Sequence, residues 1–176
     1  MRRSISLLVA LILSFNLRAQ NKNDPEFPKG EFIMYARLHN GMITNFHHFS
    51  PDIYAGGIQV VPQYTFVGNT LRGGLIAGVF FAGKKVQADF GPTISFKIKT
   101  LHIKQITSGG NVHLNIDYLF GTDQQRLLGG GINADIGNLF ILGLCAHRDH
   151  NLNNWWFQNS IAIRLTKPKK EKPIFR

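Results

Sequence analysis

Two short stretches of this chain carry residue types that could do chemistry. In His47-His48-Phe49-Ser50, His48 could act as a general base and Ser50 as a nucleophile. In His147-Arg148-Asp149-His150, two imidazoles and a carboxylate could approach a metal ion. Three candidate ligands in one stretch are not a specific metal signature, so we expect a solvated loop there, with no metal and no cofactor. The single cysteine, Cys145, excludes an intramolecular disulfide and any cysteine-rich metal site.

The composition describes one foldable domain with few charges. The chain has 176 residues, of which 44% are hydrophobic and 17% are charged. Twenty Lys and Arg against ten Asp and Glu give a net charge of +10. This length suffices to bury a core or to close a small barrel. No stretch interleaves basic and aromatic residues in the manner of a nucleic-acid site, so we expect no nucleic-acid partner.

Both ends of the chain differ from its middle. Residues 1–20 have the layout of a secretory signal, with arginines at the start, a short apolar centre and the ending Arg18-Ala19-Gln20. Residues 21–29 form a polar leader, and residues 167–176 form a basic tail. The tail is either solvated or in contact with an acidic surface such as lipid phosphates. The folded domain therefore spans residues 30–166.

This middle part alternates apolar and polar residues with a period of two, which is typical of β-strands. Between Val86 and Ile98, for example, the even positions are mostly apolar and the odd positions mostly polar. Turn residues such as Gly68-Asn69 and Gly137-Asn138 separate the alternating runs. The pattern predicts an all-β, antiparallel, up-and-down barrel of eight strands, over residues 31–47, 56–67, 70–82, 86–99, 111–120, 126–136, 139–147 and 155–166.

Asn40-Gly41 complicates this count, because Asn-Gly is a strong hairpin signal. Taken literally, it would divide the first strand and allow nine or ten strands. We favour one long, bent first strand with Gly41 at a β-bulge. Eight strands also bring both Gly-Asn turns to the same end of the barrel as the two termini.

The alternation does not tell which face of the barrel is wet, but other features favour a transmembrane barrel. Strand interiors contain few charges and many glycines, as expected where a small barrel curves tightly. Strands of this length suit a tilted membrane span. Aromatic residues gather near strand ends, as in the interfacial girdles of membrane barrels. The girdle residues that we expect are Phe46, Tyr64, Phe66, Phe81, Tyr118, Phe120, Trp155, Trp156 and Phe157.

With the apolar face outward, charged side chains point into the barrel. An eight-stranded barrel has room for side chains but not for a channel, so we expect no open pore. Buried charges are costly unless they are paired, which predicts a mutually satisfied polar network, the alternative being a narrow polar path or a small-ligand site. The predicted lumen residues are Arg37, Arg72, Asp89, Lys97, His113, Asp117, Asp135 and Arg164.

The signal-like start that ends in Ala-Gln, followed by eight amphipathic strands, resembles the small outer-membrane β-barrel proteins of Bacteroidota. The resemblance implies the outer membrane of a Gram-negative bacterium, a monomer, and contact with membrane lipid, including lipopolysaccharide, and with the barrel-assembly machinery. Such barrels commonly end on an aromatic residue, whereas here the last strand ends near Leu165-Thr166 and the basic tail follows. We expect a structural or envelope-interaction role.

Two alternatives remain open from the sequence. The first is a soluble, periplasmic, lipocalin-like barrel that holds an apolar ligand. The second is a hydrolase, because His48-Phe49-Ser50 resembles the His-x-Ser motif of outer-membrane lipid A deacylases. In that family a Glu follows the motif, whereas no Glu occurs here between Ser50 and Glu171, and the motif lies early in the chain. We therefore expect that the chain is not an enzyme.

Overall fold

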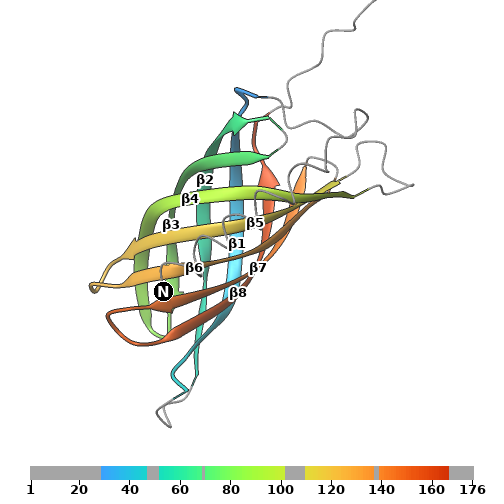
Figure 1. The fold of residues 1–176 in the computed structure, drawn as a ribbon. Coiled ribbons are helices and arrows are strands. Elements are labelled where there is room, and N and C mark those ends of the chain that lie inside the picture. The colour runs from blue at the N-terminus through green and yellow to red at the C-terminus, as the bar shows by residue number, and fades with distance from the viewer. Residues whose placement is uncertain (1–28, 47–51, 69, 102–109, 137–138, 167–176) are drawn as a thin grey trace, which may run out of the picture.

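Eight antiparallel strands close into a barrel in the computed structural model, which describes residues 29–46, 52–68, 70–101, 110–136 and 139–166. Each strand pairs with the next along the chain, and the first pairs with the last. Figure 1 shows this up-and-down order and the strong tilt of the strands. The strands are β1 Phe32–Thr44, β2 Ile53–Val67, β3 Leu71–Ala82, β4 Lys85–Leu101, β5 Gly110–Gly121, β6 Arg126–Ile136, β7 Phe140–Asp149 and β8 Trp155–Arg164.

The sequence prediction of an all-β, eight-stranded antiparallel barrel is confirmed. The main differences lie at strand ends, since β2 begins three residues earlier than expected, and β4 and β7 each end two residues later. The expected signal at 1–20, the polar leader up to residue 28 and the tail at 167–176 lie outside the described residues. Among the described residues, no helix has the length and apolar character needed to cross a membrane.

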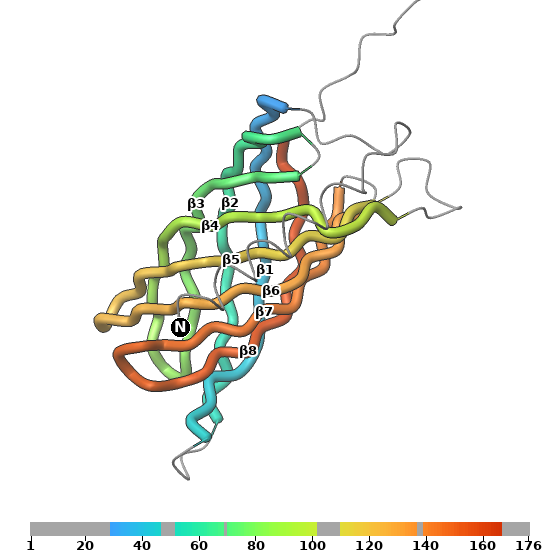
Figure 2. Tube along the Cα trace, viewed as in Figure 1, coloured from blue at the N-terminus to red at the C-terminus, as the bar shows by residue number. Residues whose placement is uncertain are grey.

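The up-and-down order gives the barrel two distinct ends (Figure 2). The first and last described residues lie at one end, together with the β2–β3, β4–β5 and β6–β7 connections; we call this the terminal end. The β1–β2, β3–β4, β5–β6 and β7–β8 connections lie at the other, which we call the loop end. The strands on either side of both Gly-Asn pairs meet the terminal end, whereas Asn69, Gly137 and Asn138 themselves lie outside the described residues.

The register of β1 shows no bulge at Gly41, so this detail of the prediction is wrong. Gly41 pairs in regular register with Ala55 on β2 and with Gln158 on β8. The register shifts lie elsewhere, at Thr65/Val67 and at Lys97/Lys99. Gly41 instead permits a close approach of two strands, because a Cβ atom there would lie 1.9 Å from the carbonyl oxygen of Phe157.

Candidate functional site

The outer face of the barrel is apolar. Side chains at alternate positions of every strand point outward, and most of the large ones are exposed. The charged residues that share this face, Lys99, Arg126 and Arg148, lie near the ends of their strands. Exposed apolar residues of the eight strands include Leu38, Ile58, Val79, Phe90, Ile116, Ile132, Leu144 and Ile161. A band free of charged side chains therefore surrounds the middle of the described barrel.

Aromatic residues border this band towards both ends. Tyr64 and Phe66 lie near the terminal end, with ring centroids 5.3 Å apart. Near the loop end the rings of Trp155 and Phe157 stack at 6.1 Å, and Phe46 meets Phe157 edge-on at 6.2 Å. The other expected girdle residues that point outward near the loop end are Phe81, Tyr118 and Phe120.

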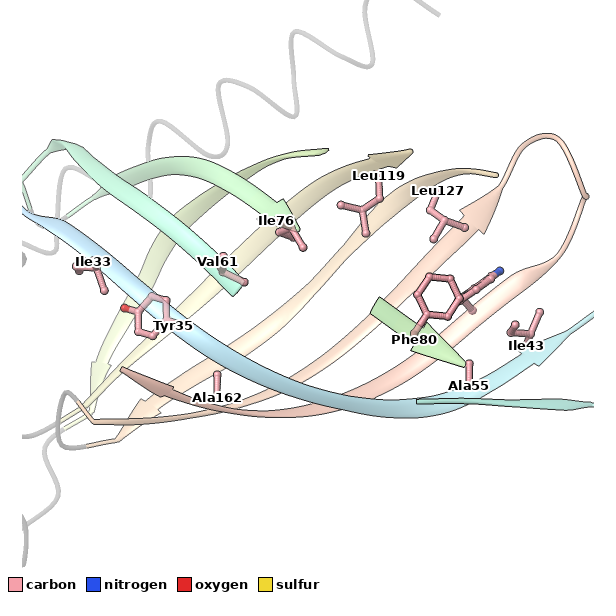
Figure 3. Packing of buried hydrophobic residues seen from close by; sticks show 11 residues of the cluster. Ile33, Tyr35, Ile43, Ala55, Val61, Ile76, Phe80, Leu119, Leu127 and Ala162 are labelled. Atoms are coloured by element: carbon pink, nitrogen blue, oxygen red, sulfur yellow. The ribbon is translucent and has the colours of Figure 1, made fainter. Parts of the chain in front are cut away.

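Trp156 does not belong to this girdle, contrary to the prediction. Its side chain is 2% exposed and packs inside the barrel against Phe80, with ring centroids 5.2 Å apart. Consecutive residues of a strand point to opposite faces, so Trp155 and Phe157 face outward while Trp156 faces inward. Figure 3 shows Phe80 near Leu127 and Ile43, whereas Ile33 and Tyr35 lie towards the other end. Phe80 and Trp156 thus close the lumen near the loop end.

At the terminal end, a buried carboxylate bridges two arginines. Glu31 Oε1 lies 2.5 Å from Arg164 Nη2, and Glu31 Oε2 lies 3.6 Å from Arg72 Nη2. Arg72 also donates hydrogen bonds to Tyr35 Oη at 3.0 Å and to Thr65 Oγ1 at 3.2 Å. These contacts tie together β1, β2, β3 and β8 across the interior, and the single carboxylate offsets part of the positive charge of the two arginines at this end.

Hydrogen bonds donated by uncharged side chains connect strands across the middle of the lumen. Gln63 Nε2 donates to Ser95 Oγ at 3.1 Å, and Ser95 Oγ donates to Asn115 Oδ1 at 3.0 Å. Gln59 Nε2 donates to Asp89 Oδ2 at 2.7 Å. Each bond links side chains from two different strands, so the interior side chains fix the spacing of the barrel walls.

An ionisable pair lies nearer the loop end. Asp117 Oδ2 lies 3.4 Å from His147 Nε2, and Asp117 Oδ1 accepts a hydrogen bond from Thr93 Oγ1 at 2.5 Å. On the neighbouring strands, Gln158 Nε2 lies 3.0 Å from His39 Nδ1. All five side chains are buried.

The interior leaves almost no free volume at its centre. A cavity of about 20 Å³ remains there, and its walls include Tyr35, Arg72, His113 and Asn115. This volume holds about one water molecule. Within the described part of the chain, the lumen is filled by side chains rather than hollow.

The structure places all eight predicted lumen residues on interior-facing strand positions. Contacts bring Arg72 and Arg164 together through Glu31, and Asp117 meets His147, whereas Asp89 lies apart with Gln59. Arg37 Nη1 lies 3.5 Å from Gln59 Oε1. The remaining members are placed by pairing, with Lys97 opposite His113 and Asp135 opposite Asn111.

Among acidic and histidine side chains, sequence reasoning missed four that are buried in the interior, Glu31, His39, His147 and Asp149. Glu31 and His39 share the alternating face of Tyr35 and Arg37, so the period of two could have identified them. The expectation of a solvated loop at 147–150 is wrong for His147 and Asp149, because β7 continues to Asp149. The Asp149 carboxylate accepts hydrogen bonds from the backbone of the loop that follows, at 3.0 and 3.1 Å.

The residues singled out for chemistry form no assembled centre among those described. No group of three or more His, Cys, Asp and Glu side chains in these ranges is arranged to hold a metal ion. Cys145 lies in β7 and makes a hydrogen bond to Gln158 Oε1 at 3.6 Å. His48 and Ser50, the candidate base and nucleophile, lie outside the described residues.

Comparison of the chain with protein-family models and with curated proteins gives no match.

Proposed function

We propose that this chain is a small outer-membrane β-barrel of a Gram-negative bacterium, without an open pore, with a structural or envelope-interaction role. The observation that supports it is the arrangement of the two faces. Charged, amide and hydroxyl side chains share the interior with a smaller number of apolar ones, whereas large apolar side chains cover the outer face between aromatic residues. In water this outer face would leave a large apolar surface exposed, whereas in a bilayer acyl chains solvate it.

The filled lumen supports the absence of a pore. Several buried polar groups meet partners from other strands, and the central cavity has room for about one water molecule. A conducting barrel needs a continuous wet path, as in the much wider porins. The interior pairs therefore act as the packed core of the protein, and the outer face and loops are the surfaces through which it acts.

The same observations disfavour a soluble carrier of an apolar ligand. Such a carrier would have an apolar lumen large enough for its ligand and a polar outer face. Here the lumen holds the Glu31–Arg72–Arg164 cluster and the Asp117–His147 pair. In this proposal the barrel is a monomer that contacts membrane lipid, including lipopolysaccharide, and is inserted by the barrel-assembly machinery.

The test is cell fractionation followed by electrophoresis of the membrane fraction in detergent, with unheated and boiled samples side by side. We expect the protein in the outer-membrane fraction, resistant to urea extraction, with a mobility that changes on boiling because the closed barrel resists detergent until heated. Release of the protein without detergent, with the same mobility in both samples, would overturn the proposal and favour a soluble barrel.

A further inference from the structure

A hollow interrupts the outer face where β6, β7 and β8 run side by side. Gly130 on β6 pairs with Ala146 on β7, which pairs in turn with Phe157 on β8. Ile132 and Leu144 form the next row towards the terminal end. Gly130 and Ala146 have small side chains, whereas the residues around them are large. The difference leaves an open, mainly apolar groove of about 780 Å³.

Gly130 has a structural reason to remain small. A Cβ atom at this position would lie 2.0 Å from the backbone carbonyl oxygen of Asn115 on β5. The floor of the groove is thus a consequence of how closely β5 and β6 pack. The groove is part of the barrel wall itself.

Two arginines lie at the loop end of this groove. Arg148 pairs with Leu128 on one side and with Trp155 on the other, one row above Gly130 and Ala146. Arg126 shares the outer face with Leu128, two residues away along β6, and is therefore a diagonal neighbour of Arg148. The Arg148 guanidinium lies 5.2 Å from the ring centroid of Trp155 and donates a hydrogen bond to Asn153, so its position is held by two contacts.

The nearby carboxylates are turned away from this rim or paired elsewhere. Asp149, next to Arg148 in sequence, is fully buried and bonded to backbone groups of the loop. Asp123 lies 3.6 Å from Lys85 at the β3–β4 turn. The outer rim of the groove therefore carries positive charge directly above an apolar surface.

We propose that this groove binds an acyl lipid whose phosphate head group carries a net negative charge. The head group would be held by Arg126 and Arg148, and one acyl chain would lie over Gly130 and Ala146 towards Leu144. Guanidinium groups form charge-assisted, often bidentate hydrogen bonds with phosphate, and the groove next to them offers mainly apolar contact to a chain, with Asn159 as an exposed polar residue of its lining. A free phosphate ion would contact the arginines without using the groove. A zwitterionic lipid would use the groove but would be held less strongly by the arginines, because its own cation offsets the phosphate charge. This inference rests on the proposed function, because the lipid reaches the groove from the bilayer.

The test is native mass spectrometry of the full chain in detergent, with synthetic phosphatidylglycerol and phosphatidylcholine of identical acyl chains. We expect the wild type to retain phosphatidylglycerol in preference to phosphatidylcholine, with no displacement by inorganic phosphate. Each arginine near an anionic head group should contribute about fivefold to affinity, so R126Q/R148Q should lose well over tenfold. Ala146→Leu should also weaken phosphatidylglycerol binding, because its side chain fills the groove.

Two matched variants serve as controls. Lys85→Gln removes a positive charge at the same end but away from the groove, and Ala77→Leu adds the same bulk to the outer face of β3. Both should bind phosphatidylglycerol like the wild type. Equal losses in R126Q/R148Q and Lys85→Gln, no preference between the two lipids, or full displacement by inorganic phosphate would each overturn the lipid site.

The mobility change on boiling separates this inference from the proposed function. If the wild type shows the mobility change but has no lipid preference, only the proposed lipid site is contradicted. If the wild type lacks the mobility change and is released without detergent, the proposed membrane barrel is contradicted as well. Each variant is scored for lipid binding only if its own mobility still changes on boiling.

Discussion

Glu31 and Arg164 are 133 residues apart in the sequence, and their side chains meet inside the barrel at 2.5 Å. Glu31 lies directly before β1 and Arg164 is the last residue of β8, so this contact lies where the first and last strands close the barrel. The second carboxylate oxygen of Glu31 reaches Arg72 on β3, at 3.6 Å. One carboxylate thus joins the seam of the barrel to β3, two strands away from β1.

Removal of this carboxylate should destabilise the barrel strongly. Glu31→Gln keeps the size of the side chain but leaves Arg72 and Arg164 buried without their shared counter-charge. Breaking a buried ion pair by removing one partner costs about 3–5 kcal/mol. The free energy of unfolding in urea, followed by tryptophan fluorescence of the lipid-reconstituted protein, measures this loss.

An exposed ion pair provides the matched control. Asp123→Asn removes the partner of Lys85 at the protein surface, where such pairs contribute about 1 kcal/mol or less. We expect this variant to unfold close to the wild type. If Glu31→Gln and Asp123→Asn changed stability equally, the buried cluster would not be the closure that the geometry indicates.

Alanine substitutions of Phe80 and Phe81 test which face of the barrel forms the packed core. The two residues are neighbours on β3, yet Phe80 is 2% exposed and Phe81 is 57% exposed. Phe80→Ala should cost about 3–5 kcal/mol, because it opens a cavity beside Trp156. Phe81→Ala should cost much less, since a lipid chain can fill the space it leaves. The same unfolding assay compares the two, and a larger loss for Phe81→Ala would contradict the assignment of faces.

A lysine on the outer face distinguishes a membrane barrel from a soluble one. Ile116 lies in the middle of β5 and Val86, 73% exposed, lies at the loop end of β4. In a bilayer, Ile116→Lys should cost about 2–4 kcal/mol and Val86→Lys about 0–1 kcal/mol, because the penalty depends on depth. In a soluble barrel both positions would face water and tolerate lysine. Equal tolerance in urea unfolding would therefore contradict the membrane proposal.

The period of two explains why so much of the fold could be predicted from the sequence. Each strand alternates inward and outward residues, so the assignment of one position fixes its neighbours, and eight interior residues followed from this pattern. Trp156 was assigned wrongly because three consecutive aromatic residues were treated as one group, although alternation turns the middle one inward.

Other features depended on contacts between distant segments, which the local pattern does not contain. Glu31 acquires its role only when β1 meets β3 and β8, and Asp149 only when its carboxylate receives the backbone N–H groups of the loop. The groove across β6, β7 and β8 likewise depends on the register that places Gly130 beside Ala146. Register and closure follow from the whole barrel rather than from any single strand.

Gly41 shows the same dependence on closure and leads to a last prediction. A Cβ atom there would lie 1.9 Å from the carbonyl oxygen of Phe157 on β8, so Gly41→Ala must push β1 and β8 apart at the seam. Forced backbone shifts of this kind cost about 1–3 kcal/mol. Gly56→Ala, on the adjacent strand, is the control, because its Cβ would meet only the exposed Tyr54 side chain, which can rotate away. We expect Gly41→Ala to lower the free energy of unfolding and the fraction of protein that resists unheated detergent, and Gly56→Ala to do neither. If both variants behaved like the wild type, the strands at the seam would be farther apart than the structure indicates.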